Sequence, residues 1–203
     1  MIPSIYSDEI AGQLTRNSLE EEGIEVEIGE SLLIENSEIN SEIIAILKPD
    51  GYYCPRKGQK PPPKSVDGVI INKTSRDAYN YYIVELKSSK LTKIRKTDIQ
   101  EKFHTIFDRM FTIDLKHIFQ EIPHDIDSLN LWLVCDPLGV RKKCKDIDTL
   151  KKELEQTSNR IKGLMSEYAS GLKPIIYRGK VLKIELILSP PTLEIDGYVD
   201  LLA

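Results

Sequence analysis

The segments SVDGVIIN (residues 65–72) and YYIVELK (residues 81–87) decide the fold of this chain. Both are apolar and rich in β-branched or aromatic residues, and polar or turn-forming residues bound them, which predicts two strands. Three ionisable residues, Asp67, Glu85 and Lys87, interrupt these otherwise apolar segments. Charged groups inside buried strands need partners, so the segments predict a polar site within the sheet.

The predicted hairpin register places Asp67 opposite Glu85. This pairing aligns Asn72 with Asn80 and leaves residues 73–79 as a polar loop. The lysine two positions after Glu85 leaves the same face of the strand. The two carboxylates would then lie within about 5 Å of each other, and the ammonium within about 8 Å, on one sheet face. Such an arrangement suits a divalent metal ion with an adjacent cation.

Length and composition indicate a globular protein. With 203 residues and 40% hydrophobic residues, the chain is long enough to form one core, so residues 1–203 are expected to form a single domain. The net charge of -4 argues against an extensive nucleic-acid-coating surface. The sequence contains no leader pattern or membrane-spanning run, so we expect a cytoplasmic location and no membrane partner.

The hydrophobic periodicity predicts the remaining elements. Helices are expected over residues 7–23, 37–47, 97–119 and 146–169. Strands are expected over residues 24–28, 129–135, 173–177 and 181–188. This order predicts an α/β protein with a mixed central β-sheet flanked by helices, preceded by a helical N-terminal part, residues 1–50.

Adjacent carboxylates raise each other's pKa unless a cation lies between them. Oxygen ligands suit Mg²⁺, which typically takes one or two carboxylates together with waters and a substrate phosphate. A lysine beside such an ion can orient or deprotonate a water molecule, or hold a phosphate oxygen. These parts are typical of metal-assisted phosphodiester hydrolysis. The G-x-S-x-G, Walker and Gly-x-Gly-x-x-Gly motifs are absent, which argues against other common enzyme classes.

Residues 64–104 resemble the PD-(D/E)xK nuclease superfamily, which includes type II restriction endonucleases, Holliday-junction resolvases, and repair or phage nucleases. The resemblance rests on Asp67 and on the Glu85-Leu86-Lys87 triplet across a hairpin. It implies a restriction-endonuclease-like core over about residues 64–190. It also implies that Asp67 and Glu85 hold Mg²⁺, for which Mn²⁺ may substitute, and that Lys87 orients the water.

One position departs from the family pattern. The proline usually found before the first acid is Val66 here, whereas a literal Pro-Asp occurs at Pro49-Asp50. Asp50 is therefore the rival for the first acid, although it follows a predicted helix in a glycine-containing loop.

The resemblance also implies auxiliary residues. Some relatives carry a glutamine on the helix after the lysine strand, where this chain has Gln100, with His104 one turn later. Many relatives supply an acid from an upstream helix, for which Glu42 or Glu38 would qualify. The alternative interpretation of all four residues is a solvated helix surface.

Two basic clusters bracket the acids in the sequence and are candidates for DNA binding. They are Arg56, Lys57, Lys60 and Lys64, and then Lys90, Lys93, Arg95 and Lys96. Such residues would contact phosphates more than bases, and solvated loops are the alternative interpretation.

The sequence thus predicts a Mg²⁺-dependent DNA endonuclease, specifically a small sequence-specific type II restriction enzyme. Cleavage of both strands of double-stranded DNA favours a homodimer with one site in each subunit. A Holliday-junction resolvase or a repair or phage nuclease is the first alternative. The second is a non-catalytic DNA- or protein-binding module that retains the fold.

Overall fold

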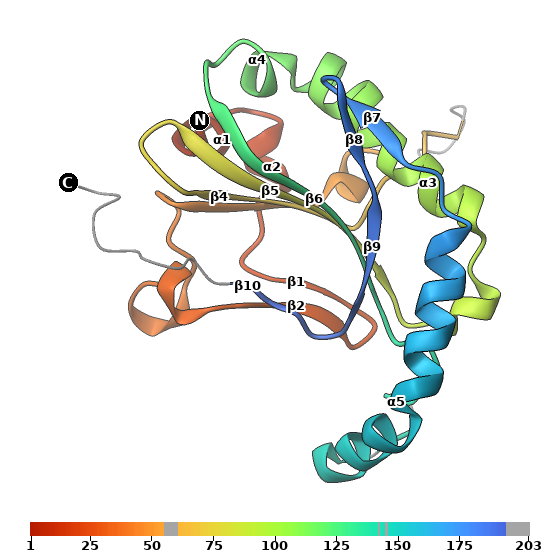
Figure 1. The fold of residues 1–203 in the computed structure, drawn as a ribbon. Coiled ribbons are helices and arrows are strands. Elements are labelled where there is room, and N and C mark those ends of the chain that lie inside the picture. Colours follow the sequence, from red (N-terminus) through yellow and green to blue (C-terminus); the bar gives the residue numbers. More distant parts are fainter. Residues whose placement is uncertain (55–60, 142, 145, 194–203) are drawn as a thin grey trace.

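A five-stranded mixed β-sheet forms the centre of the molecule (Figure 1). The structure is a computed structural model that describes residues 1–54, 61–141, 143–144 and 146–193. In spatial order the strands are β3 (Ile44–Leu47), β4 (Gly68–Lys73), β5 (Ala78–Lys87), β6 (Asp125–Cys135) and β9 (Ile184–Leu188). The pairs β3–β4 and β4–β5 are antiparallel, whereas β5–β6 and β6–β9 are parallel. The predicted mixed central sheet is confirmed.

The hairpin of β4 and β5 has the predicted register. Asn72 pairs with Asn80, and Gly68 pairs with Val84. The pairing continues one residue further on each strand, so the connecting turn is shorter than predicted and spans residues 74–77.

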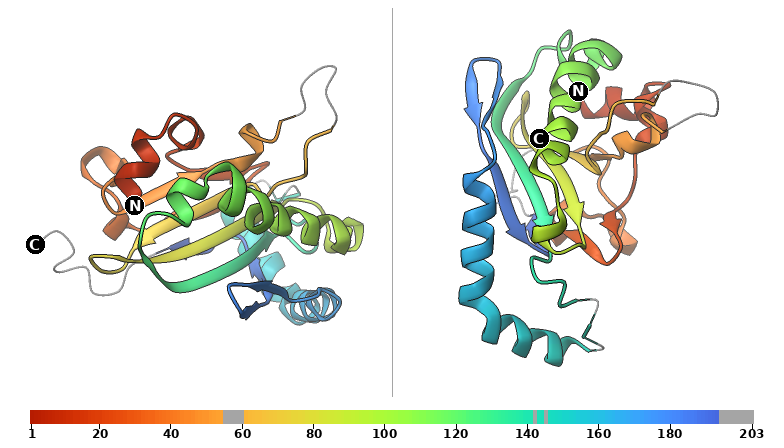
Figure 2. Two further views of the ribbon diagram at one scale, coloured as in Figure 1. Left: turned by 90° about the horizontal axis from the view of Figure 1, so that it is seen from above. Right: turned by 90° about the vertical axis from the view of Figure 1, so that its right-hand side faces the viewer.

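Helices cover one face of the sheet (Figure 1, Figure 2). They are α1 (Ile2–Ser7), α2 (Ala11–Leu14), α3 (Lys96–Thr105), the π-helical segment η5 (Ile106–Asp114) and α4 (Lys116–Phe119). Their apolar side chains form one core with Tyr81 and Ile83 of β5 and with Leu131 and Leu133 of β6. Because side chains alternate along β5, Glu85 also faces this helical layer.

A second, three-stranded sheet covers the opposite face, where the sequence predicted helices. It consists of β1 (Leu19–Glu21), β2 (Ile24–Ile28) and β10 (Thr192–Leu193). The predicted strand over residues 24–28 is thus confirmed as β2. Leu19, Ile24 and Val26 pack there against Val84 and Leu86 of β5.

The predicted helix over residues 7–23 is wrong. The chain forms α1 and α2 with a break between them, and then the hairpin of β1 and β2. The Asp8 carboxylate accepts hydrogen bonds from the amides of Ile10 and Ala11, which holds the break. Glu22 and Gly23 have φ values of 50° and 76°, which form the tight turn between the two strands.

The predicted helix over residues 37–47 is also wrong, because its second half is β3. Every side chain of β3 is buried, since Ala45 and Leu47 face the helical layer while Ile44 and Ile46 face the small sheet. A strand buried on both faces is a continuous apolar run, and periodicity cannot distinguish it from a helix. The N-terminal part, residues 1–50, is therefore mixed. Its remaining elements are the 3-10 turns η1 (Glu30–Leu32), η2 (Glu35–Ser37) and η3 (Pro49–Gly51).

The later elements agree with their predictions in part, because the strand predicted over residues 181–188 is divided at Lys183 into two strands of different sheets. The segment predicted as a helix over residues 97–119 contains α3, η5 and α4, and the one over residues 146–169 is α5 (Ile147–Ser170). The Asp146 carboxylate caps α5 by accepting a hydrogen bond from the Thr149 amide. Helix α5 lies beside β9 and extends beyond the sheet (Figure 1, Figure 2). The predicted C-terminal hairpin consists of β7 (Ile175–Tyr177) and β8 (Lys180–Leu182), after which β9 enters the central sheet.

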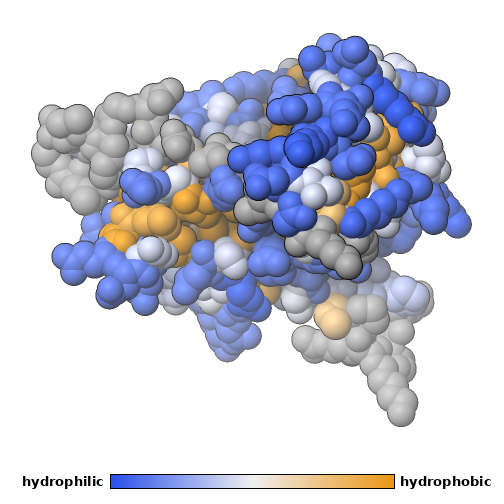
Figure 3. All heavy atoms as spheres, turned by 90° about the horizontal axis from the view of Figure 1, so that it is seen from below, coloured by the Kyte–Doolittle hydropathy of each residue, from blue (hydrophilic) through white to orange (hydrophobic). Residues whose placement is uncertain are grey.

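Hydrophilic side chains cover much of the face seen from below, with hydrophobic areas between them (Figure 3). None of the helices within the described ranges is long and apolar enough to cross a membrane.

Candidate active site

Asp67 and Glu85 lie together at the end of the β4–β5 hairpin. Asp67 directly precedes β4, and continuing the register from the Gly68–Val84 pair places it opposite Glu85. Both acids contact one ammonium group, that of Lys102, whose Nζ lies 2.6 Å from Glu85 Oε1 and 3.8 Å from Asp67 Oδ1. These oxygens are therefore no more than about 6.4 Å apart. The two acids therefore lie close enough to share one cation.

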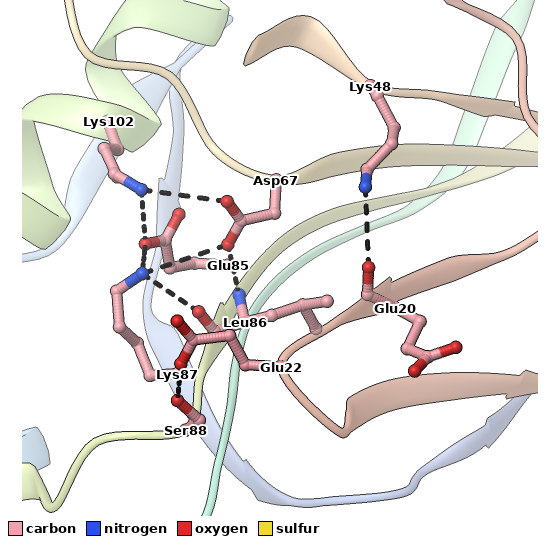
Figure 4. A network of polar contacts seen from close by, with 9 residues as sticks. All are labelled: Glu20, Glu22, Lys48, Asp67, Glu85, Leu86, Lys87, Ser88 and Lys102. Carbon is pink, nitrogen blue, oxygen red and sulfur yellow. Dashed lines mark hydrogen bonds and ion pairs between the residues drawn. The ribbon is translucent and has the colours of Figure 1, made fainter.

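The backbone of β5 fixes the Asp67 carboxylate. The Leu86 amide donates a hydrogen bond of 2.6 Å to Asp67 Oδ2 (Figure 4). Asp67 is 6% exposed, so this buried bond holds the carboxylate over the strand that carries Glu85. The rival acid, Asp50, is instead exposed in η3.

Lys87 reaches back over its own strand toward the acids. Its Nζ lies 2.5 Å from Glu85 Oε1 and 4.0 Å from Asp67 Oδ2, and it donates a hydrogen bond of 2.9 Å to the Leu86 carbonyl. Burial alone would lower the pKa of Lys87, but the charges of Glu85 and Asp67 outweigh it and raise this pKa. Lys87 is therefore a charged donor in this arrangement.

Lys102 is a site residue that the sequence interpretation missed. It comes from α3 and points down onto the acids, opposite Lys87 (Figure 4). A helical wheel could have found it, because at about 3.6 residues per turn Lys102 lies nearer than His104 to the buried stripe of Ile99 and Phe103.

The two oxygens of Glu85 have different surroundings. Oε1 accepts a hydrogen bond from Lys102 and forms an ion pair with Lys87. Among the described residues, Oε2 is the only buried side-chain oxygen or nitrogen that has no hydrogen-bond partner. Burial raises the pKa of Glu85 to about 7, and the charge of Asp67 adds to this rise while the two lysines oppose it. A buried, unpaired carboxylate oxygen is costly, so this position fits a further cation.

Two more acids reach the site from the end of β1 and from the turn that follows it. The Glu21 carboxyl hydrogen-bonds to Asp67, and burial followed by the charge of Asp67 raises the pKa of Glu21. Glu22 accepts a hydrogen bond from the Ser88 hydroxyl just after β5 (Figure 4). The predicted auxiliary acid Glu42 is instead exposed in a turn before β3, because no helix forms there. Its alternative Glu38 is exposed as well.

The predicted auxiliary residues on α3 do not reach the acids. Gln100 donates a hydrogen bond of 3.2 Å to the Lys173 carbonyl. His104 is half exposed and lies 3.5 Å from Asp108 on the next helical turn. Both side chains leave α3 on the opposite side of the buried stripe from Lys102, so the structure does not bring them together with the acids.

A basic cleft of about 440 Å³ adjoins the acids. It is lined by Lys64, Lys87, Ser89, Lys93, Ile94, Arg95, Asp98, Ile99 and Lys102. The segment between β5 and α3, including the 3-10 turn η4 (Leu91–Lys93), supplies much of this lining. Five of the nine lining residues are cationic and one is acidic, so the cleft can bind an anion beside the carboxylates.

The predicted DNA-binding residues divide into three groups. Lys64, Lys93 and Arg95 line the basic cleft, although Lys64 also forms ion pairs with Asp98 and Glu101. Lys90 lies beside Gly139, and Lys96 lies over the Tyr168 ring of α5, so neither contributes to the cleft lining. Arg56, Lys57 and Lys60 fall outside the described residues.

The donor set at the site suits a hard divalent ion. Asp67 and Glu85 supply carboxylate oxygens, and Glu85 Oε2 is buried and unpaired. The described residues contain no ready-made group of three or more histidine, cysteine, aspartate or glutamate ligands. Mg²⁺ does not require one, because it usually keeps several waters and takes one or two carboxylates.

Comparison with known proteins returned no match from family models, curated proteins or solved structures.

Proposed function

We propose that this protein is a Mg²⁺-dependent DNA endonuclease, specifically a small sequence-specific type II restriction enzyme. The observation that carries the proposal is the buried Glu85, which shares the ammonium groups of Lys87 and Lys102 with Asp67 and whose Oε2 has no hydrogen-bond partner. A mixed sheet whose hairpin presents two acids and a lysine on one face also fits the family that residues 64–104 resemble.

In the proposed reaction, Asp67 and Glu85 hold Mg²⁺, or Mn²⁺ in its place. The ion would supply Lewis-acid activation of the phosphodiester. Lys87 donates hydrogen bonds that orient the attacking water and balance the negative charge developing on phosphorus. Without the ion, the neighbouring carboxylates raise the pKa of Lys87, so we assign its ammonium the role of a charged donor.

The basic cleft supports a phosphodiester substrate. The chain as a whole carries a net charge of -4, yet the lining of this cleft is mainly cationic and is continuous with the acids through Lys87 and Lys102. A polyanion would thus bind with one phosphate beside the carboxylates. In the proposal, double-stranded DNA occupies the cleft, and a homodimer brings one site to each strand.

A cleavage assay tests the proposal. The purified protein is incubated with plasmid DNA and Mg²⁺, beside an EDTA control and the variants Asp67→Asn, Glu85→Gln and Lys87→Ala. We expect discrete fragments from the wild type, loss of cleavage in EDTA, and rates lowered by about 10² or more in each variant. Asp50→Asn is the matched control, because Asp50 is the rival acid but is exposed in η3; it should cut normally.

The substrate preference separates the alternatives. Discrete plasmid fragments support a restriction enzyme, whereas cleavage of four-way junctions without plasmid fragments supports a resolvase. Failure of a well-folded protein to cut any form of DNA in Mg²⁺ or Mn²⁺ would contradict the nuclease proposal and leave the non-catalytic binding module.

A further inference from the structure

We propose that Lys102 is a resident cation, which neutralises Asp67 and Glu85 until a divalent ion displaces it into the basic cleft. This inference rests on the proposed function, since it concerns the same site. It assigns to Lys102 a role that neither the resemblance nor the other site residues supply.

The position of the Lys102 ammonium carries the argument. Its Nζ lies 2.6 Å from Glu85 Oε1 and 3.8 Å from Asp67 Oδ1, so it contacts one oxygen of each acid. A divalent ion held by these two carboxylates would have to occupy much the same space. An ammonium and a divalent ion cannot both fit there, because their like charges repel strongly at such short separations.

The charge balance of the site also favours displacement of Lys102 by the ion. Asp67, Glu85, Lys87 and Lys102 form a directly contacting set of two acids and two ammonium groups, and Glu21 adds a third carboxyl group through its hydrogen bond to Asp67. Adding a divalent ion to this set would leave excess positive charge in a largely buried place. Moving Lys102 away removes one positive charge and frees oxygens for the ion.

The structure offers a destination for the displaced side chain. Lys102 also lines the basic cleft, with Lys64, Lys93 and Arg95. It is 19% exposed, so its flexible stem can turn toward the cleft without unfolding of α3. In the cleft its ammonium would meet a substrate phosphate instead of the acids. Lys87 is less free to move, because it is also bonded to the Leu86 carbonyl.

The first test measures Mn²⁺ binding by isothermal titration calorimetry, with metal-stripped protein and no nucleic acid. Lys102→Met should bind Mn²⁺ about tenfold or more tightly than the wild type, because a competing positive charge is gone. Lys93→Met is the matched control. This substitution removes the same charge from the cleft lining. The Lys93 side chain is more exposed, so solvent screens its charge, and Mn²⁺ affinity should change by about twofold at most.

A second measurement does not require a folded variant. Limited acetylation of the wild type, followed by mass spectrometry, reports how accessible each lysine is. Addition of Mn²⁺ should increase labelling of Lys102 severalfold and leave Lys116, which is paired with Glu121 on the surface, unchanged.

The outcomes are distinguishable. Weaker or equal Mn²⁺ binding by Lys102→Met, or equal labelling of Lys102 with and without the ion, would overturn the displacement of Lys102 while leaving the metal site intact. If the wild type binds no Mn²⁺, or if Asp67→Asn binds it equally well, the metal site in the proposed function fails as well.

Discussion

At the scale of single residues, close backbone approach shapes the site as much as charge does. Gly68 follows Asp67 directly, and a Cβ atom built there would lie 2.4 Å from Leu19 Cδ2 and 2.6 Å from Leu19 Cδ1. Leu19 is fully buried in β1, the strand that brings Glu21 to Asp67. The glycine therefore lets β1 pack directly over the start of β4.

Gly68→Ala should destabilise the protein by about 1–3 kcal/mol, because the new methyl group overpacks the buried Leu19 side chain. Urea denaturation measures this change. Gly163→Ala is the control, since nothing lies within 4 Å of a Cβ at that helical position. That variant should be more stable than the wild type by up to about 1 kcal/mol. Equal stability of wild type and Gly68→Ala would contradict the close packing.

The residues that the sequence revealed are those whose geometry follows from one hairpin. Side-chain alternation places Glu85 and Lys87 on one face, and the polar residues at the turn set the register of Asp67. Lys102 and Glu21 come from other elements, so their positions depend on the rotation of α3 and on a sheet that was not predicted. Local pattern carries no information about such packing.

At the scale of elements, α1, α2 and α4 are joined by one small polar contact. His117 Nε2 of α4 lies 2.6 Å from the Asp8 carboxylate between α1 and α2. Burial alone would raise the pKa of Asp8, but the amide of Ala11 and the His117 side chain outweigh it and lower the pKa.

Asp8→Asn should lower the free energy of unfolding at about pH 7 and have little effect at about pH 3 or below. The folded state holds the pKa of Asp8 below its unfolded value, so its stabilisation exists above that unfolded value and is lost as the pH falls through the folded one. Urea denaturation of wild type and variant across this pH range tests it. An equal difference at both pH values would show that the charge of Asp8 is irrelevant.

The helix α5 was predictable because it is buried on one side only. Helix α5 has a capping aspartate and a regular apolar stripe, and both ends agree with the prediction to within a residue or two. β3 has no polar side, and the covering sheet β1–β2–β10 joins residues from the two ends of the chain. Contacts between residues so far apart in sequence leave no short-range signal.

At the scale of the whole molecule, an acidic chain presents one cationic cleft. The net charge is -4, while the cleft gathers Lys64, Lys87, Lys93, Arg95 and Lys102. The cleft is therefore a place where electrostatic attraction to a polyanion is concentrated. The assignment of residues 1–203 to one domain stays a prediction.

Binding of double-stranded DNA in EDTA should depend only moderately on salt. Contacts to about two to four phosphates predict a slope of about -2 to -4 for the logarithm of the binding constant against the logarithm of salt concentration. Fluorescence anisotropy between about 50 and 300 mM KCl measures it. A slope steeper than about -6 would mean that DNA contacts extend well beyond the cleft.

Glu85 Oε1 forms ion pairs with both Lys87 and Lys102, and this sharing links ion binding to DNA binding in our proposal. An ion that enters must displace Lys102, and a DNA phosphate in the basic cleft would stabilise the displaced lysine. DNA and the divalent ion would then strengthen each other's binding. Copies of the protein without DNA would hold the ion more weakly than copies bound to DNA.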